Sequence, residues 1–254
     1  MQQLRTPDGT TTLVLIRHAQ AADRDEDGHL RLCGWLDVPL TLHGRQEAEC
    51  VPVAAAGLGP VAALYTSSLQ RAVQTAMPIA RALEVTARPL SSLREISCGD
   101  LEGVLVRDVQ RQYSGLWQAN LAQDDDAFSW PGGESYATFR TRVLGTLERI
   151  RQSHIGGTVL VVTHSGVISQ VIGSLVGELA ARWELFRPAT ASVTEVRWTG
   201  ERGAVVCFND RRHLTALRSP QSVGAADDAQ VVAHSSGGRE PLTLGPAGGV
   251  HGDP

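Results

Sequence analysis

The chain has 254 residues, 42% of them hydrophobic, so it can bury a sizeable core, and its formal net charge is only −4. This weak charge gives no reason to expect a nucleic acid or an anionic membrane as partner, and no apolar run approaches the roughly 18 residues that span a bilayer. Residues 1–12 lack the apolar segment of a signal peptide, so we expect a soluble, cytoplasmic protein. The four cysteines have no Cys-x-x-Cys spacing, so we expect reduced thiols and no zinc site.

The first predicted strand ends in an arginine and a histidine. Apolar and β-branched residues run from Thr11 to Ile16 and lead directly into Arg17 and His18. Such a run is typical of a buried strand, and open α/β sheets bind ligands beyond the carboxyl ends of their strands. We therefore expect Arg17 and His18 at the mouth of the sheet. Taken alone, the pair is better interpreted as a histidine with a structural role.

The next segments alternate between loop, helix and strand. Residues 20–32 form a polar loop whose acidic run, 23–27, is interpreted as a solvated face. Thr41 is a plausible N-cap for a helix that reaches about Ala56, and a second strand covers 61–66. Ser-x-x-Gln at 67–70 matches a capping box. This places Arg71 in the first turn of the following helix, again at the mouth of the sheet.

The middle of the chain carries a strand and a long loop over 84–103, which contains Glu95, and a helical stretch around 104–117. Residues 120–130 are interpreted as an exposed connection. Pro-Gly-Gly-Glu-Ser at 131–135 opens a helix with apolar residues at helical spacing. A further buried strand, 158–163, then ends in His164. Two core strands that each end in histidine are harder to explain by packing alone.

The remaining elements complete an α/β fold. A helix is predicted from about 166 to 175, followed by strands at 191–198 and 204–208 that are joined by a hairpin turn. Because strands alternate with helices, we expect a three-layer α/β/α arrangement with a mostly parallel central sheet. One domain should cover residues 1–218. Residues 219–254 are rich in Gly, Ala, Ser and Pro, which is typical of a disordered tail.

Five motifs together resemble the histidine phosphatase superfamily, which has a phosphoglycerate mutase-like fold. They are Arg-His-Ala at 17–19, where the family usually has glycine third, Gly-Trp-Leu-Asp-Val-Pro-Leu-Thr at 34–41, Ser-Ser-Leu-Gln-Arg-Ala-Val-Gln-Thr-Ala at 67–76, Leu-Arg-Glu-Ile at 93–96, and Thr-His-Ser-Gly at 163–166. The likeness covers roughly residues 11 to 215. The Pro-Gly-Gly-Glu-Ser segment resembles the phosphatase branch of the family.

The resemblance implies a histidine acid-type phosphatase, a phosphoric monoester hydrolase that forms a phosphohistidine and needs no cofactor or metal. Its catalytic residues would be His18 as nucleophile, Glu95 as general acid, and Arg17, Arg71 and His164 around the phosphate. The Leu-Arg-Glu-Ile context favours Glu95 over the neighbouring Asp100 and Glu102. Substrate contacts are expected at Arg17, Arg24, Cys33, Gly34, Arg71, His164 and Ser165.

The residue types suit this chemistry. Arginine forks can hold phosphate oxygens in a bidentate manner, and they can stabilise charge as it develops. A neutral imidazole can attack phosphorus, and nearby positive charge should lower the pKa of His18 and keep it neutral. Taken singly, Arg71 would be interpreted as a surface residue and Arg17 as half of an ion pair.

Two alternatives remain open: a cofactor-dependent phosphoglycerate mutase and a catalytically inactive phosphate-binding module. Mutases of the family resemble one another in a Glu-Arg-His-Tyr-Gly stretch, but here residues 95–99 read Glu-Ile-Ser-Cys-Gly, without the arginine and tyrosine that would hold the substrate. The complete catalytic set argues against an inactive module. The partner is expected to be a small phosphorylated substrate, and a homodimer is left open.

The tail generates a first testable expectation. Residues 219–254 hold too little apolar surface to offset the entropy cost of ordering. Deleting them should leave the melting temperature and the turnover of a phosphate ester nearly unchanged. A melting temperature lower by more than several degrees would show that this segment packs against the domain.

Overall fold

The computed structural model describes residues 9–217. The expected tail at 219–254 and the domain boundary at 218 lie outside the described residues. Within 9–217, no helix has the length and apolar character needed to cross a bilayer. The helices and strands, in order, are β1 (Thr11–Arg17), α1 (Leu42–Ala55), β2 (Val61–Ser67), α2 (Gln70–Leu83), β3 (Ala87–Leu90), η1 (Ser91–Leu93), η2 (Gly99–Leu101), α3 (Val106–Gln112), α4 (Ser114–Ala122), α5 (Tyr136–Ser153), β4 (Thr158–Thr163), α6 (Ser165–Leu175), β5 (Val193–Thr199), β6 (Arg202–Asp210) and η3 (Arg212–Leu217).

The six strands form one mixed sheet in the order β3-β2-β4-β1-β5-β6. Strands β1 to β4 are parallel, while β5 runs antiparallel to β1 and β6 antiparallel to β5. In the register of β1 and β4, Arg17 lies opposite Thr163. The residues that follow these two strands, His18 and His164, therefore emerge side by side at the carboxyl edge. The predicted mostly parallel α/β sheet is confirmed.

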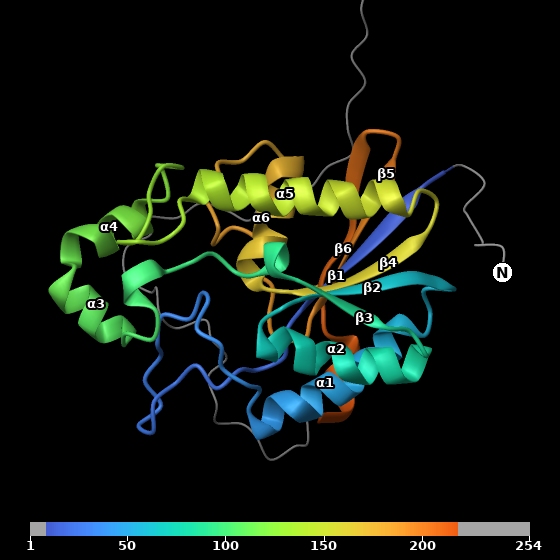
Figure 1. The fold of residues 1–254 in the computed structure, drawn as a ribbon, viewed down its shortest axis with the longest axis horizontal. Helices are drawn as coiled ribbons and strands as arrows, with labels where there is room; N and C mark the ends of the chain where they lie inside the picture. Colours follow the sequence, from blue (N-terminus) through green and yellow to red (C-terminus); the bar gives the residue numbers. More distant parts are fainter. Residues whose placement is uncertain (1–8, 218–254) are drawn as a thin grey trace, which may run out of the picture. The chain divides into compact units, whose positions relative to one another are not determined.

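Helices cover both faces of the sheet, as Figure 1 shows with α5 and α6 above it and α1 and α2 below. Alternate residues of β1 serve the two layers, because successive side chains of a strand point to opposite faces. Val14 and Ile16 pack in the cluster with α1 and α2, whereas Leu13 and Leu15 pack with α5 and α6. All four side chains are at most 1% exposed. The continuous apolar run predicted from sequence is thus explained by burial on both faces.

A third apolar cluster joins α3 and α4 to the segments around 98–101 and 128–136. The helical stretch predicted around 104–117 is present, divided into the two helices α3 and α4. The exposed connection expected at 120–130 is wrong, because that segment contains the buried side chains of Asn120, Phe128 and Trp130. The three aspartates at 124–126 led to the prediction of an exposed segment, although buried aromatic residues follow them. Tyr136 donates its hydroxyl hydrogen to Asn120 Oδ1 at 2.5 Å, which satisfies the buried amide.

The helix N-termini follow the sequence in two cases and depart from it in one. Thr41 and Ser135 cap α1 and α5, since their hydroxyl oxygens accept hydrogen bonds from the amides of Gly44 and Thr138. The predicted capping box at 67–70 is wrong, because α2 begins after Leu69, which has no side-chain cap. Ser67 instead remains in β2, where its hydroxyl oxygen lies 2.7 Å from Nε2 of His164, the residue that follows β4.

One arginine of α5 ties this helix to the segment that carries Glu95. Arg142 uses all five N–H donors of its guanidinium group. Two reach the carboxylate of Glu134 at 2.8 and 2.6 Å, and three reach the carbonyl oxygens of Ser92, Arg94 and Glu95 at 3.0 to 3.1 Å. The Arg142 and Glu134 side chains are only 19% and 11% exposed. This interaction sets the path of the chain between β3 and Glu95.

Replacing Arg142 by methionine should therefore destabilise the fold by about 3 kcal/mol, because a mostly buried carboxylate and three carbonyl groups lose their partner. The measurement is urea unfolding followed by circular dichroism. Arg149→Met is the matched control on the same helix, since its guanidinium is exposed and makes one hydrogen bond, at 3.2 Å to Thr146. The control should cost less than about 0.5 kcal/mol. Equal losses in the two variants would contradict the role given to Arg142.

Candidate active site

The candidate site lies at the carboxyl edge of the parallel strands. His18 follows β1, Ser67 ends β2, His164 follows β4, and Glu95 lies on the segment that leaves β3. The main chain of His18 is held on both sides, since its amide donates to Thr163 at 2.8 Å and its carbonyl accepts from Ala191 at 3.2 Å. The His18 and His164 rings meet edge to face, with centroids 5.1 Å apart. The structure therefore brings together the two histidines that the sequence singled out.

The tautomer of His18 follows from one hydrogen bond. Its Nδ1 atom lies 2.8 Å from the carbonyl oxygen of Ala19. Because a carbonyl can only accept, Nδ1 must carry the hydrogen, and in the neutral ring Nε2 then keeps its lone pair. The acceptor that fixes the tautomer could not be named from sequence.

Burial keeps the two imidazoles neutral. The pKa of His18 lies well below its usual 6.5, first because the ring is desolvated and then because of the positive charges of Arg71 and Arg17. The pKa of His164 is lowered in the same way, with burial again the largest cause and Arg71 next. The lowering of the histidine pKa by nearby arginine charges, which the sequence predicts, is present, but desolvation lowers the pKa more.

Ser67 links the end of β2 to His164. Its hydroxyl oxygen accepts from the amide of Leu69 at 3.3 Å and lies 2.7 Å from His164 Nε2. The Ser67 hydroxyl can donate to Nε2 while its oxygen accepts from Leu69, and in that tautomer Nδ1 of His164 carries the ring hydrogen. That buried Nδ1 has no partner among the described residues. In that tautomer it is an N–H donor available to an oxyanion, on a ring that meets the His18 ring edge to face.

Arg71 places a buried positive charge next to these rings. It lies in the first turn of α2 and is 1% exposed. Its Nη1 and Nη2 atoms donate to the carbonyl oxygens of Leu36 and Gly34 at 2.8 and 2.7 Å. Within residues 9–217, no carboxylate forms an ion pair with Arg71. A buried cation without a counter-ion is costly, so this position favours an anionic ligand.

The residues beside His18 fit the same arrangement. Arg17 donates from Nη1 to the carbonyl oxygen of Pro188 at 2.7 Å, and its charge is felt by both histidines. Ala19 replaces the glycine usual in the resembling family, and its methyl group is fully buried among the apolar residues below the sheet. Its φ angle is not among the positive ones, so the backbone does not require glycine here.

Glu95 faces the N-terminus of α6. One carboxylate oxygen accepts from the amide of Gly166 at 2.9 Å, and the other accepts from the amide of Ile96 at 3.0 Å. A Cβ atom on Gly166 would overlap Glu95 Oε1, so glycine permits this close approach. These two hydrogen bonds fix the orientation of the Glu95 carboxyl group. They hold it at the N-terminus of α6, which begins with Ser165 directly after His164.

Glu102, which could be mistaken for the general acid, has another task. Its two oxygens accept four backbone N–H groups, those of Gly34, Trp35, Leu36 and Cys98, at 2.6 to 3.0 Å. This carboxylate holds the loop whose carbonyl groups in turn accept from Arg71. Sequence reasoning missed that function, for which the only signal was an acidic residue close to Glu95.

The expected substrate contacts in the loop before Gly34 are less direct. The Cys33 thiol donates weakly to the carbonyl of Leu36, and burial raises its pKa to about 11. Gly34 uses its amide and carbonyl groups on Glu102 and Arg71. Arg24 donates to the carbonyl of Gly28 at 2.9 Å, within its own loop. Substrate contacts of these three residues stay predictions.

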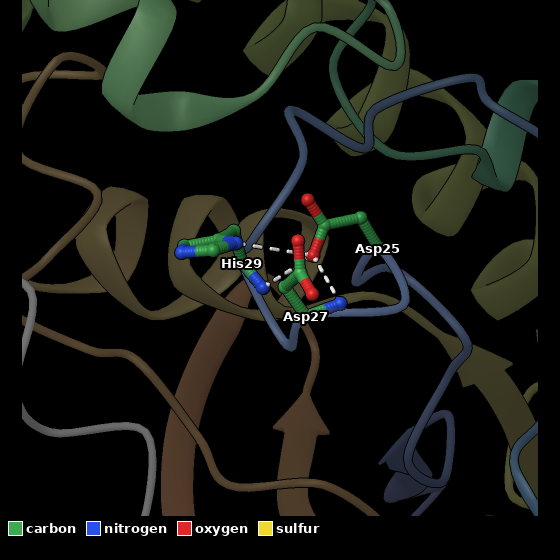
Figure 2. A group of neighbouring side chains, drawn as sticks. All are labelled: Asp25, Asp27 and His29. Atoms are coloured by element: carbon green, nitrogen blue, oxygen red, sulfur yellow. Dashed lines mark hydrogen bonds and ion pairs between the residues drawn. The ribbon is translucent and has the colours of Figure 1, made fainter.

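The acidic run in this loop is an ordered turn, as Figure 2 shows for Asp25, Asp27 and His29. Asp25 Oδ1 accepts from the amides of Asp27 and His29 at 3.1 and 2.8 Å, and lies 3.2 Å from His29 Nδ1. Hydrogen bonds to His29 lower the pKa of Asp25. The three side chains could offer ligand atoms within 4.8 Å of one another, but two are exposed and Asp25 already holds the turn. We therefore assign this group a role in loop structure.

Comparison with known proteins identifies the family of this chain. Residues 13–211 match the family model of the histidine phosphatase superfamily (branch 1). Phosphoserine phosphatase 1 of Hydrogenobacter thermophilus is 28% identical over 202 residues, covering 80% of this chain and 93% of that protein. The 2,3-bisphosphoglycerate-dependent phosphoglycerate mutase of Bartonella quintana is 36% identical over 173 residues, covering 65% and 82%.

The structural comparison agrees. A crystal structure described as a putative alpha-ribazole-5'-P phosphatase from Escherichia coli superposes with a TM-score of 0.69 and 25% identity, covering 79% of this chain and 97% of that one. The family-model match over residues 13–211 includes both paired histidines, Arg71 and Glu95. The chain belongs to the histidine phosphatase superfamily, branch 1.

Proposed function

We propose that this protein hydrolyses phosphomonoesters of small metabolites through a phosphohistidine on His18. The observation that carries the proposal is the buried guanidinium of Arg71, which has no carboxylate partner within residues 9–217 and lies beside two neutral imidazoles. A phosphoryl group would supply the missing negative charge. The Nδ1–H donor of His164 and the guanidinium of Arg17 would complete its surroundings.

In the first step, the Nε2 lone pair of His18 attacks phosphorus. An N–P bond forms, the ester P–O bond breaks, and its electron pair stays on the alkoxide oxygen. The carbonyl oxygen of Ala19, which accepts the hydrogen bond from Nδ1, stabilises the positive charge that develops on the ring. Arg71 can shift its hydrogen bonds from loop carbonyls to phosphate oxygens with little movement, because its side chain is already buried and ordered.

Glu95 is the group that would give a proton to the leaving oxygen. In the structure it accepts two amide hydrogen bonds, which suit its charged form. An incoming phosphate places negative charge nearby and favours the protonated form, which is what a general acid needs. After the alcohol leaves, the Glu95 carboxylate takes a proton from water, the water oxygen attacks phosphorus, the N–P bond breaks, and His18 is restored.

A phosphoglycerate mutase is the second candidate function, because several relatives, including the Bartonella quintana protein, carry that name. It is less favoured because the residues after Glu95 face the interior. Ile96 packs against two apolar clusters and Cys98 is 5% exposed, so neither can grip a substrate as the arginine and tyrosine of mutases would. An inactive module would not explain a buried imidazole whose tautomer is fixed so that Nε2 keeps its lone pair.

Several narrower predictions accompany this function. The acid-type assignment is supported by the low pKa of His18, which keeps the nucleophile unprotonated in mildly acidic solution. A reducing, cytosolic location is supported by the four cysteines, all of which are free thiols. The proposed partner is a small phosphorylated ester, without nucleic acid or membrane, and a homodimer stays open.

The intermediate can be trapped directly. Rapid quenching with radiolabelled para-nitrophenyl phosphate should give a phosphoenzyme that is labile in acid and stable in base. His18→Ala should abolish the label and reduce turnover by at least about 10⁴-fold, since attack by His18 then has no substitute. His43→Ala is the control, because this histidine lies on α1 with a side chain 53% exposed. Label that persists on His18→Ala at its original level would disprove the assignment.

A further inference from the structure

An exposed aromatic ring and an arginine lie beside Glu95, outside the set of groups that would surround the phosphate. Trp35 is 41% exposed, although it follows a glycine whose carbonyl binds the buried Arg71. Its indole nitrogen donates to the carbonyl oxygen of Glu95 at 2.8 Å. The guanidinium of Arg94 stacks over the indole, 5.3 Å from its centroid. We call Trp35 and Arg94 the rim pair.

The guanidinium of Arg94 is held in place but not neutralised. Its Nε atom donates to the hydroxyl of Ser68 at 2.7 Å. Within residues 9–217, its terminal nitrogens make no hydrogen bond and its charge forms no ion pair with a carboxylate. The side chain is half-buried, so stacking and the Ser68 contact have already restricted its rotamers. Two terminal nitrogens in a fixed plane are suited to bidentate contact with an anion.

The position of the rim pair relates it to the leaving group. Ser68 follows Ser67, which contacts His164, and Arg94 precedes Glu95, the proposed proton donor. In an in-line displacement the leaving oxygen lies opposite His18 and next to its proton donor. The remainder of the substrate then extends past Glu95, whose carbonyl oxygen binds the indole of the rim pair.

We propose that the leaving group of the substrate carries a second anionic group, a carboxylate or a second phosphate, which binds the terminal nitrogens of Arg94 against the face of Trp35. This inference rests on the proposed hydrolysis and adds a specificity-determining residue to it. The arginines then bind different parts of the substrate. Arg71 and Arg17 bind the phosphoryl group that is transferred, and Arg94 binds the leaving group and so selects the substrate.

A purely structural stacked pair would look similar, and the chain provides one for comparison. Arg88 lies over the ring of Tyr65 with its guanidinium 5.7 Å from the centroid, on β3 and away from the strand ends that carry the histidines. Arg88 is exposed and contacts the Tyr65 hydroxyl at 3.5 Å. Arg88→Gln therefore removes the same charge and the same kind of stacking without touching the proposed site.

The test measures kcat/KM for two matched pairs of esters. Phosphoserine and phosphoethanolamine differ only by a carboxylate, and fructose bisphosphate and fructose monophosphate differ by a phosphate. Wild-type protein should prefer the anionic member of at least one pair by roughly tenfold or more, the size expected for a charge-assisted contact. The pair that shows the preference identifies the anion. Arg94→Gln should remove most of it, mainly through KM, while Arg88→Gln should retain it.

Arg94→Lys is the control for a folding defect. It keeps the charge but loses the planar guanidinium, so it should retain an intermediate preference for the anionic ester. A wild-type enzyme that hydrolyses both members of each pair equally would overturn the inference, as would a preference that Arg94→Gln leaves unchanged. In those outcomes para-nitrophenyl phosphate is still hydrolysed, so the phosphatase itself stands. Loss of all ester hydrolysis and of the phosphoenzyme would instead refute the proposed function.

Discussion

The buried charge of Arg71 is the constraint around which the rest of the site is arranged. A guanidinium that is 1% exposed needs acceptors, and in the described structure it finds the carbonyl oxygens of Gly34 and Leu36. A carboxylate in their place would neutralise the cation and repel a phosphate. Carbonyl groups satisfy its hydrogen bonds without cancelling the charge, so the site keeps a positive potential that also disfavours protonation of His18 and His164.

The carboxylates near the site have separate tasks, which their partners reveal. Glu102 binds four backbone amides and fixes the loop that supports Arg71, and Glu134 pairs with Arg142, which fixes the path of the chain before Glu95. Glu95 itself accepts only two amides, one from the N-terminus of α6. Among these three, it alone lies at the strand ends with the histidines. Rigid surroundings of this kind hold the proposed proton donor in orientation before substrate binds.

Much of this site could be predicted because it follows from periodicity and topology. Two buried apolar runs ending in histidine had to meet once the strands paired in parallel, and Arg71 had to lie at the same edge because α2 follows β2. Hydrogen-bond partners that depend on contacts distant in sequence could not be predicted. The role of Ser67 was misread as a helix cap because its spacing to Gln70 fits that motif, whereas its hydroxyl belongs to His164. The buried aromatic residues at 128 and 130 were obscured by the acidic residues before them.

The central claim is that His18 is a neutral nucleophile with its hydrogen on Nδ1. Long-range nitrogen–proton NMR of the phosphate-free protein tests it most directly, with the His18 signals assigned by their loss in His18→Ala. As the pH falls from neutral to 6.5, the usual pKa of histidine, the account predicts that His18 stays neutral with Nδ1 protonated and Nε2 bare. A hydrogen found on Nε2 of the neutral ring, or an imidazolium half formed at or above pH 6.5, would contradict it.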